Sequence, residues 1–238
     1  MTEERLNNDH YHIVQDKMSL FPSYYSWILS SFKNILSGSI IDLGTGKGII
    51  VNEYQSISRD LTLVDFNPQI VNFLKNEYSS SEVFNLDLCT DNWSASLPKK
   101  YDNIVSLDLL EHIDNENAFF SNINNILKDN GLFIAKVPAQ SKLYSEMDKA
   151  SGHYRRYDPI DFEKLAKSHN LEIVSINSFN KFGALLYPFK NKQKTNFSST
   201  MSVWQIKLAN IMIPIFSVID KLLPTKGLSY IVVFKKSA

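Results

Sequence analysis

The sequence has almost no cysteine, since Cys89 is the one thiol among 238 residues. A single cysteine cannot form an internal disulfide, so we expect buried apolar surface to stabilise the fold, and a hydrophobic share of 44% is sufficient for this. The amino terminus, Met-Thr-Glu-Glu-Arg, is polar and acidic and lacks the apolar run of a secretory signal. These features predict a cytoplasmic protein.

Net charge and long apolar runs are also lacking. Lys plus Arg and Asp plus Glu each number 25, and no basic stripe is present, which argues against nucleic acid as a partner. The most apolar segment, 201–223, is interrupted by Pro214 and by polar residues, so we expect no transmembrane segment. Three interpretations of this segment stay open: packing against the sheet, a hydrophobic lid or acyl groove, and a surface at about 203–223 for peripheral membrane contact or dimerisation.

What the sequence does contain is a strand-like apolar run that passes directly into three glycines at alternate positions. Gly44, Gly46 and Gly48 can adopt dihedral angles that are closed to other residues. A helix opening near Lys47 would offer unpaired N–H groups to a ligand. The third glycine comes one residue too early for the G-x-G-x-x-G pattern of dinucleotide-binding proteins, and Asp42 would repel a pyrophosphate. We therefore expect a zwitterionic or cationic ligand.

Further strand-like runs end in polar residues. Residues 61–65 end in Asp65, about twenty residues after the glycines, where doubly wound folds place the carboxylate that binds a ribose diol. Residues 83–87 end in Asp87, and residues 103–107 lead into another acid. Strands that alternate with helices predict a parallel sheet, and the carboxyl ends of its strands would meet at one crevice.

From about residue 39 to residue 176 the chain resembles the class I S-adenosylmethionine-dependent methyltransferases. The likeness is to the bacterial small-molecule branch, and it is carried by Leu-Glu-His-Ile at 110–113 and Gly-His-Tyr-Arg-Arg-Tyr at 152–157. One departure is the turn at 128–131, where relatives usually carry Pro-Gly, although Asn and Gly both tolerate positive φ.

This resemblance implies a three-layer α/β/α, Rossmann-like fold around a seven-stranded, mostly parallel sheet whose last strand is antiparallel. It also implies S-adenosylmethionine as the cofactor and S-adenosylhomocysteine as the product. The implied cofactor-binding residues are Asp42, Gly44, Thr45, Gly46 and Gly48 around the methionine end, Asp65 at the ribose, Asp87 and Leu88 at the adenine, together with Phe66 and Leu107.

His112 is the candidate catalytic base. It follows the fourth strand, at the methyl end of the crevice, and an imidazole with an ordinary pKa of about 6.5 can accept a proton at neutral pH. The alternative is that Glu111 and His112 only begin a helix. A metal held by both residues is a further alternative, and we expect none. Asp9, His10 and His12 lack a further partner at ligand spacing and are expected to be solvated.

Two adjacent arginines, Arg155 and Arg156, are the strongest hint about the substrate. Their guanidinium groups suit forked recognition of carboxylate or phosphate, so we expect an acidic substrate. The alternative is that each pairs with a nearby aspartate and fastens the loop over the cofactor. In resembling enzymes an N-terminal segment caps the crevice, which adds tyrosines. The candidate substrate-binding residues are Tyr24, Tyr25, Tyr144, His153, Arg155, Arg156 and Tyr157.

These interpretations together predict an N-terminal helical cap at 1–37 and a methyltransferase domain at 38–238 with a helical insertion at about 180–227. The expected function is methyl transfer to oxygen, in preference to nitrogen, of a small, anionic or lipophilic metabolite. The alternative is a catalytically silent module that binds S-adenosylmethionine or a partner. The oligomeric state stays open.

Overall fold

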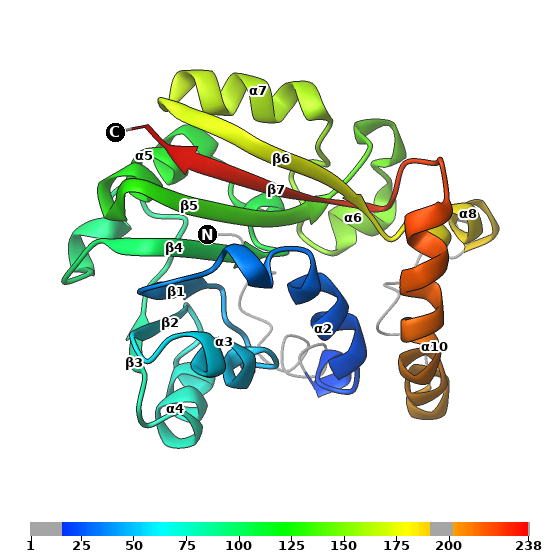
Figure 1. Cartoon of the computed structure of the whole chain (residues 1–238), viewed down its shortest axis with the longest axis horizontal. Helices are drawn as coiled ribbons and strands as arrows, with labels where there is room; N and C mark the ends of the chain where they lie inside the picture. The colour runs from blue at the N-terminus through cyan, green and yellow to red at the C-terminus, as the bar shows by residue number, and fades with distance from the viewer. Residues whose placement is uncertain (1–15, 191–201, 238) are drawn as a thin grey trace.

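The computed structural model describes residues 16–190 and 202–237 (Figure 1). Asp9, His10 and His12, which the sequence predicts to be solvated, lie outside this part of the chain. The described residues form a central sheet with helices on both faces.

The sheet has seven strands in the order β3-β2-β1-β4-β5-β7-β6. Neighbouring strands from β3 to β5 are parallel, whereas β7 is antiparallel to both β5 and β6. This topology confirms the expected three-layer architecture with an antiparallel last strand. The strands are β1 (Ile40–Leu43), β2 (Leu61–Asp65), β3 (Glu82–Asn85), β4 (Tyr101–Leu107), β5 (Leu127–Pro138), β6 (Leu171–Phe179) and β7 (Ser229–Lys236).

Alternating side chains on the central strands build a core on each face of the sheet. On β5, Phe133 and Ala135 belong to one core and Ile134 belongs to the other, as the two-residue period of a strand requires. The first core is covered by α5 (Glu116–Ile126) and α7 (Pro159–Ser168). The second is covered by α2 (Pro22–Ser30), α3 (Val51–Ile57) and α4 (Pro68–Glu77).

The remaining helices are short or lie in connections. They are the 3-10 turns η2 (Lys33–Ile35), η3 (Trp93–Ser96), η4 (Leu110–His112) and η5 (Ser141–Leu143), and the helices α6 (Glu146–Ala150), α8 (Lys181–Lys190) and α10 (Val203–Leu222).

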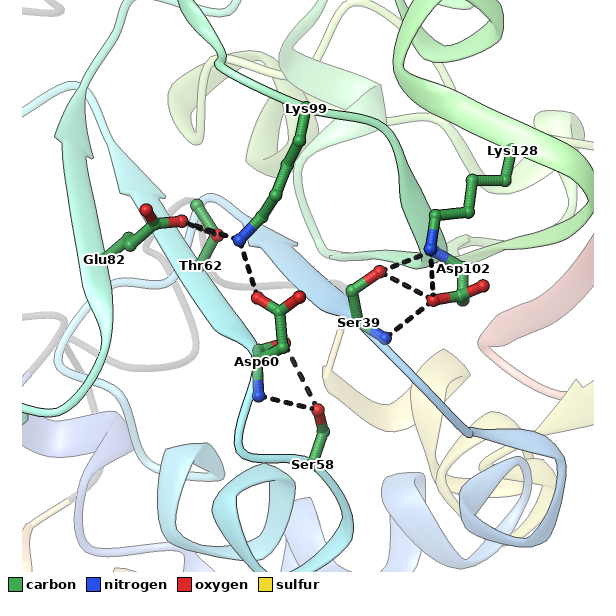
Figure 2. A network of polar contacts seen from close by, with 8 residues as sticks. All are labelled: Ser39, Ser58, Asp60, Thr62, Glu82, Lys99, Asp102 and Lys128. Atoms are coloured by element: carbon green, nitrogen blue, oxygen red, sulfur yellow. Dashed lines mark hydrogen bonds and ion pairs between the residues drawn. The ribbon is translucent and has the colours of Figure 1, made fainter.

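Polar side chains tie the strands together at the edge of the sheet where β1, β2 and β3 begin (Figure 2). Asp102 accepts hydrogen bonds from the Ser39 backbone N–H at 2.8 Å and from the Lys128 ammonium at 2.8 Å. Lys99 donates to Asp60 at 2.6 Å and to Glu82 at 2.9 Å. This network occupies the amino ends of the strands, so the carboxyl ends lie at the opposite edge.

The insertion between β6 and β7 contains α8 and α10. α10 packs mainly against α2 and α8, and it stands at the end of the strands in Figure 1. Its buried side chains are Ile206, Ile213 and Asp220. Of the three interpretations left open for this segment, direct packing against the sheet does not describe α10, because α2 covers the second core and α10 packs on α2.

Candidate active site

The glycine turn after β1 lies at the carboxyl edge of the sheet. Gly44, Gly46 and Gly48 have φ values of 77°, 56° and 70°, in the left-handed region that favours glycine. The Gly44 and Thr45 N–H groups both donate to the Val64 carbonyl, which holds the turn against β2. The turn therefore keeps bare backbone at the carboxyl ends of β1 and β4, where the strand order reverses. This is the usual ligand position in open α/β sheets.

The helix after this turn begins later than the sequence predicts. α3 starts at Val51 rather than near Lys47, and Ile50 is its N-terminal flanking residue. The cause is the third glycine, since the Gly48 N–H donates to Thr45 O and closes a separate turn before the helix. The bare backbone next to the crevice thus belongs to the turn and not to a helix terminus.

Asp65, at the end of β2, is 1% exposed and faces the glycine turn. Its carboxylate accepts the Gly46 N–H at 2.9 Å and the Asn67 N–H at 2.9 Å. Asn67 in turn caps α4 by accepting from the Gln69 N–H at 2.9 Å. One acid therefore connects the turn after β1 to the start of α4, and its position is set by backbone on both sides.

Asp42 lies one strand away and is 4% exposed. The pKa of its carboxyl is raised to about 7, mainly by burial; a hydrogen bond from Thr45 opposes the shift and the charge of Asp65 adds to it. Among the residues that the structure describes, no lysine or arginine lowers this pKa, so the buried carboxylate is suited to attract a positive group of a ligand. A Cβ added to Gly44 would touch the Leu109 side chain at 3.4 Å, so the φ of 77°, and not a lack of space, is what favours glycine there.

The polar end of β3 completes this side of the crevice. Asp87 is exposed, and its carboxylate accepts the Cys89 N–H at 2.9 Å. Leu88 is 5% exposed within the core, and Phe66 is 44% exposed just after β2. Leu107 packs against the second core at the end of β4.

His112 lies in η4, directly after β4, and meets the loop that carries His153. The two imidazole rings are edge to face, with centroids 4.8 Å apart. His112 Nδ1 lies 3.2 Å from the Gly152 carbonyl oxygen, which places the proton on Nδ1 and leaves Nε2 as the basic nitrogen. The Tyr154 N–H also donates to Glu111 O at 2.8 Å, so the backbone fastens the loop to η4.

Glu111 is buried next to this pair, with 1% exposure. Burial raises the pKa of its carboxyl to about 8, and the negative charge of Asp108 adds to the increase. A group that could hold a metal ion is formed here by Glu111, His112 and His153. Each offers one ligand atom, and the three atoms lie within 4.8 Å of one another. Sequence reasoning considered the first two residues together and did not anticipate that His153 joins them.

The arginine loop is held by carboxylates. Arg156 is nearly buried, and its Nε donates to Asp148 at 2.8 Å, while His153 Nδ1 lies 3.2 Å from the same carboxylate. Burial alone would raise the pKa of Asp148, but hydrogen bonds from His153 and Arg156 lower it to about 2. Arg155 pairs with Glu116, whose carboxylate also accepts the Tyr157 hydroxyl at 2.7 Å.

The expected tyrosines occupy two different places. The Tyr144 hydroxyl donates to the His153 carbonyl at 2.7 Å and so braces the loop. Tyr157 is 1% exposed and stacks on Phe162 in the core. Tyr24 and Tyr25 come from α2, and burial raises the pKa of each hydroxyl above its ordinary value.

Sequence reasoning missed Lys136, a buried lysine on β5. Its ammonium is bonded to both carboxylate oxygens of Asp108, at 2.5 and 2.6 Å, and lies 5.8 Å from the centre of the Tyr24 ring. Burial would lower the pKa of Lys136, but Asp108 raises it above the ordinary lysine value. Asp108 itself has a φ of 54°, which is uncommon for a residue with a side chain. A lysine within the otherwise apolar run 132–138 is the signal that could have revealed this ion pair.

Comparisons with known proteins agree with this arrangement. A family model described as "Methyltransferase domain" matches residues 15–176. Methyltransferase 235L of Invertebrate iridescent virus 6 is 30% identical over 92 residues, which are 38% of this chain and 33% of that protein. The mitochondrial ubiquinone biosynthesis O-methyltransferase of Schizosaccharomyces pombe is 25% identical over 147 residues, 58% of this chain and 54% of that protein. The matches thus span about half or less of these two relatives.

Solved structures share the fold at low sequence identity. A S-adenosylmethionine-dependent methyltransferase from Archaeoglobus fulgidus has a TM-score of 0.58 and 18% identity, covering 88% of this chain and 93% of that one. Coclaurine N-methyltransferase, bound to N-methylheliamine and S-adenosylhomocysteine, has a TM-score of 0.59 and 17% identity, covering 90% and 72%.

The family match extends from the residues before α2 into β6, and it includes the glycine turn, both buried acids and η4. A buried acid beside bare glycine backbone fits a cofactor that carries an ammonium group, and a second acid at the end of β2 fits a ribose. The chain belongs to the class I S-adenosylmethionine-dependent methyltransferases.

Proposed function

We propose that this enzyme transfers a methyl group to a hydroxyl oxygen of a small molecule, with His112 as the base that accepts the hydroxyl proton. The observation that carries the proposal is the pair of imidazoles, His112 and His153, held at the carboxyl edge of β4. Relatives named ubiquinone biosynthesis O-methyltransferase support an oxygen acceptor, among them one from Pelagibacter ubique that is 23% identical over 192 residues.

The cofactor-binding roles follow from charge and position. We assign the ammonium group of S-adenosylmethionine to Asp42, its ribose hydroxyls to Asp65, and its adenine to the end of β3 around Asp87 and Leu88. When bound, the cofactor supplies an electrophilic methyl group on a sulfonium. Gly44, Thr45, Gly46 and Gly48 would line the methionine part, with Phe66 and Leu107 alongside.

The protein's own contribution is to hold the acceptor in line and to remove its proton. If Nδ1 of His112 donates to the Gly152 carbonyl at 3.2 Å, Nε2 is the nitrogen that accepts the hydroxyl proton. Glu111, with a pKa raised to about 8, is mostly protonated at neutral pH and so adds little negative charge next to the imidazole. Positioning of this kind can account for much of the rate of a displacement reaction.

The acceptor would approach between the loop 144–157 and α2. The arginines of that loop pair with Glu116 and Asp148, so we assign Arg156 mainly to fastening the loop, while Arg155, at its surface, is the candidate to contact an anionic group. Tyr24 and Tyr25 would cover the acceptor from the side of α2, and Tyr144 and Tyr157 would support the loop.

A matched pair of acceptors tests the proposal. Catechol and ortho-phenylenediamine have the same ring and differ in the attacking atom, so each is incubated with the protein and methyl-labelled S-adenosylmethionine. We expect labelled product from catechol with a kcat/KM well above that for the diamine, and strong loss of it in His112→Gln. Preferred methylation of the diamine would show a nitrogen acceptor and would refute the proposal.

A further inference from the structure

An apolar stripe runs along the side of α10 that faces away from the rest of the protein. Its members follow one another at intervals of four and three residues, which places them on one line of a helix. Their exposed fractions range from 53% to 79%. Among the residues that the structure describes, α10 buries its other side and not this one. The stripe consists of Trp204, Leu208, Ile211, Ile215, Val218 and Leu222.

The opposite side of α10 is fixed to the protein by specific contacts. Ile206 and Ile213 are buried, and the Asn210 side-chain oxygen accepts the Ser23 N–H of α2 at 2.9 Å. Asp220 is 5% exposed and accepts the Phe182 N–H of α8 at 2.9 Å. By length and composition alone the helix could cross a membrane, but crossing would break these bonds and place Asp220 in lipid. The stripe is therefore the surface available to a partner.

The insertion that carries α10 is strongly basic, although the whole chain has 25 basic and 25 acidic residues. Between residues 180 and 227 the one acid is Asp220, which is buried and already bonded to backbone. The same segment contains seven lysines, namely Lys181, Lys190, Lys192, Lys194, Lys207, Lys221 and Lys226. A basic segment next to a wholly apolar stripe is complementary to a surface that is anionic outside and apolar beneath.

We propose that α10 docks in the plane of an anionic lipid bilayer, with the stripe inserted at the boundary between headgroups and acyl chains and the exposed Lys207, Lys221 and Lys226 at the phosphates. A second copy of the chain fits less well. Two α10 helices packed along the stripe would bring Lys207 and Lys221 of both copies to the interface, and α10 has no exposed acid to pair with them.

Docking in this orientation would also place the active-site edge near the bilayer. The insertion leaves the sheet after Phe179 and returns at Ser229, which are the end of β6 and the start of β7. Both points lie at the carboxyl edge, because β6 and β5 are each antiparallel to β7. The docking proposal goes beyond the proposed oxygen acceptor and does not depend on it.

Co-sedimentation of the full chain with vesicles tests the inference. We expect binding to vesicles of phosphatidylcholine and phosphatidylglycerol at about 7:3, and at least tenfold weaker binding to phosphatidylcholine alone, because each lysine near an anionic surface contributes on the order of fivefold in affinity. Ile211→Glu with Ile215→Glu should reduce binding about a hundredfold by removing apolar insertion. Lys207→Gln with Lys221→Gln should reduce it about tenfold and weaken its salt dependence.

A matched control is Ile160→Glu with Val174→Glu, which adds the same charge at two exposed apolar residues outside α10. We expect this variant to bind vesicles about as well as the wild type, apart from the loss that its two added negative charges cause. We expect all variants to keep the wild-type thermal midpoint. The inference fails if the wild type does not sediment with anionic vesicles, or if the control loses binding as completely as the stripe variant. It also fails if sedimentation velocity shows a wild-type dimer that the stripe variant dissociates, since the stripe is then a contact between copies.

Discussion

Replacing Asp65 by alanine should remove most of the affinity for S-adenosylhomocysteine. In the structure one oxygen of this carboxylate accepts the Gly46 N–H and the other accepts the Asn67 N–H, each at 2.9 Å, so the group is held rigidly at the end of β2. Hydrogen bonds from two ribose hydroxyls to a charged carboxylate contribute about 1.5 to 3 kcal/mol, which corresponds to roughly ten- to a hundredfold in Kd.

The same substitution should lower stability by a separate route. The Gly46 and Asn67 N–H groups lose their acceptor at a site that is 1% exposed, and each buried unsatisfied group costs about 1 to 3 kcal/mol. Part of this cost is recovered if water enters the space of the missing carboxylate. Thermal unfolding without ligand measures the effect on stability, and calorimetric titration well below the thermal midpoint measures the affinity.

Asp60→Ala is the matched control, because Asp60 precedes the same strand at its opposite end (Figure 2). There the carboxylate is half exposed and pairs with Lys99, and an exposed pair of this kind contributes about 1 kcal/mol or less. We expect the control to bind S-adenosylhomocysteine as the wild type does. If Asp65→Ala binds the ligand with unchanged affinity while folded, the ribose assignment is refuted, and equal losses in both variants would indicate a general effect of destabilisation.

Four further results are expected. His112→Gln should leave S-adenosylhomocysteine affinity within a few-fold and reduce turnover by about 10² to 10⁴, as for loss of a general base, and EDTA should not reduce wild-type turnover; a loss that added metal restores would instead show a metal centre. S-adenosylhomocysteine should bind about tenfold more tightly at pH 8 than at pH 6, because Asp42 has a pKa of about 7 and only its ionised form attracts an ammonium group. Calorimetric titration of Asp42→Asn should show no such rise in affinity. Arg156→Lys should lower the thermal midpoint together with cofactor affinity, since an ammonium cannot reproduce the guanidinium bonds, whereas a raised KM at unchanged stability would make this residue a substrate contact. Asp108→Asn should cost more stability than Lys136→Met, because it leaves a buried ammonium without its anion. Equal losses in the free energy of unfolding of the two variants, measured with denaturant, would contradict this order.

The sequence could predict that the candidate cofactor residues meet at one edge of the sheet, because these residues are local. Asp42 and the three glycines lie within seven residues of chain, and Asp65 ends the next strand. A parallel sheet brings the carboxyl ends of such strands to one edge whatever the details of packing. The late start of α3 was not predictable in the same way, because it depends on the hydrogen bond from Gly48 to Thr45.

The acceptor side depends on contacts between distant segments. Asp108 and Lys136 are 28 residues apart, and they meet because β4 and β5 pair in a register that sets Leu107 beside Lys136. His153 reaches His112 through a loop that backbone bonds fasten to η4. Sequence spacing contains no information about either meeting, since both result from strand register and loop closure.

The sequence by itself determined the fold class, and its resemblance to a known family indicated the cofactor. Strand-like runs that end in acids specify a doubly wound sheet, and glycines at alternate positions specify bare backbone at its edge. Only the tertiary structure decided what the arginines and α10 contact. Arg156 is committed to Asp148, and α10 is displaced from the sheet by α2 so that its apolar stripe faces outward. The physical reason is that residue type and periodicity show which side chains are apolar or charged and which of them share a face. Packing against the rest of the chain decides which of these side chains remain exposed to a partner.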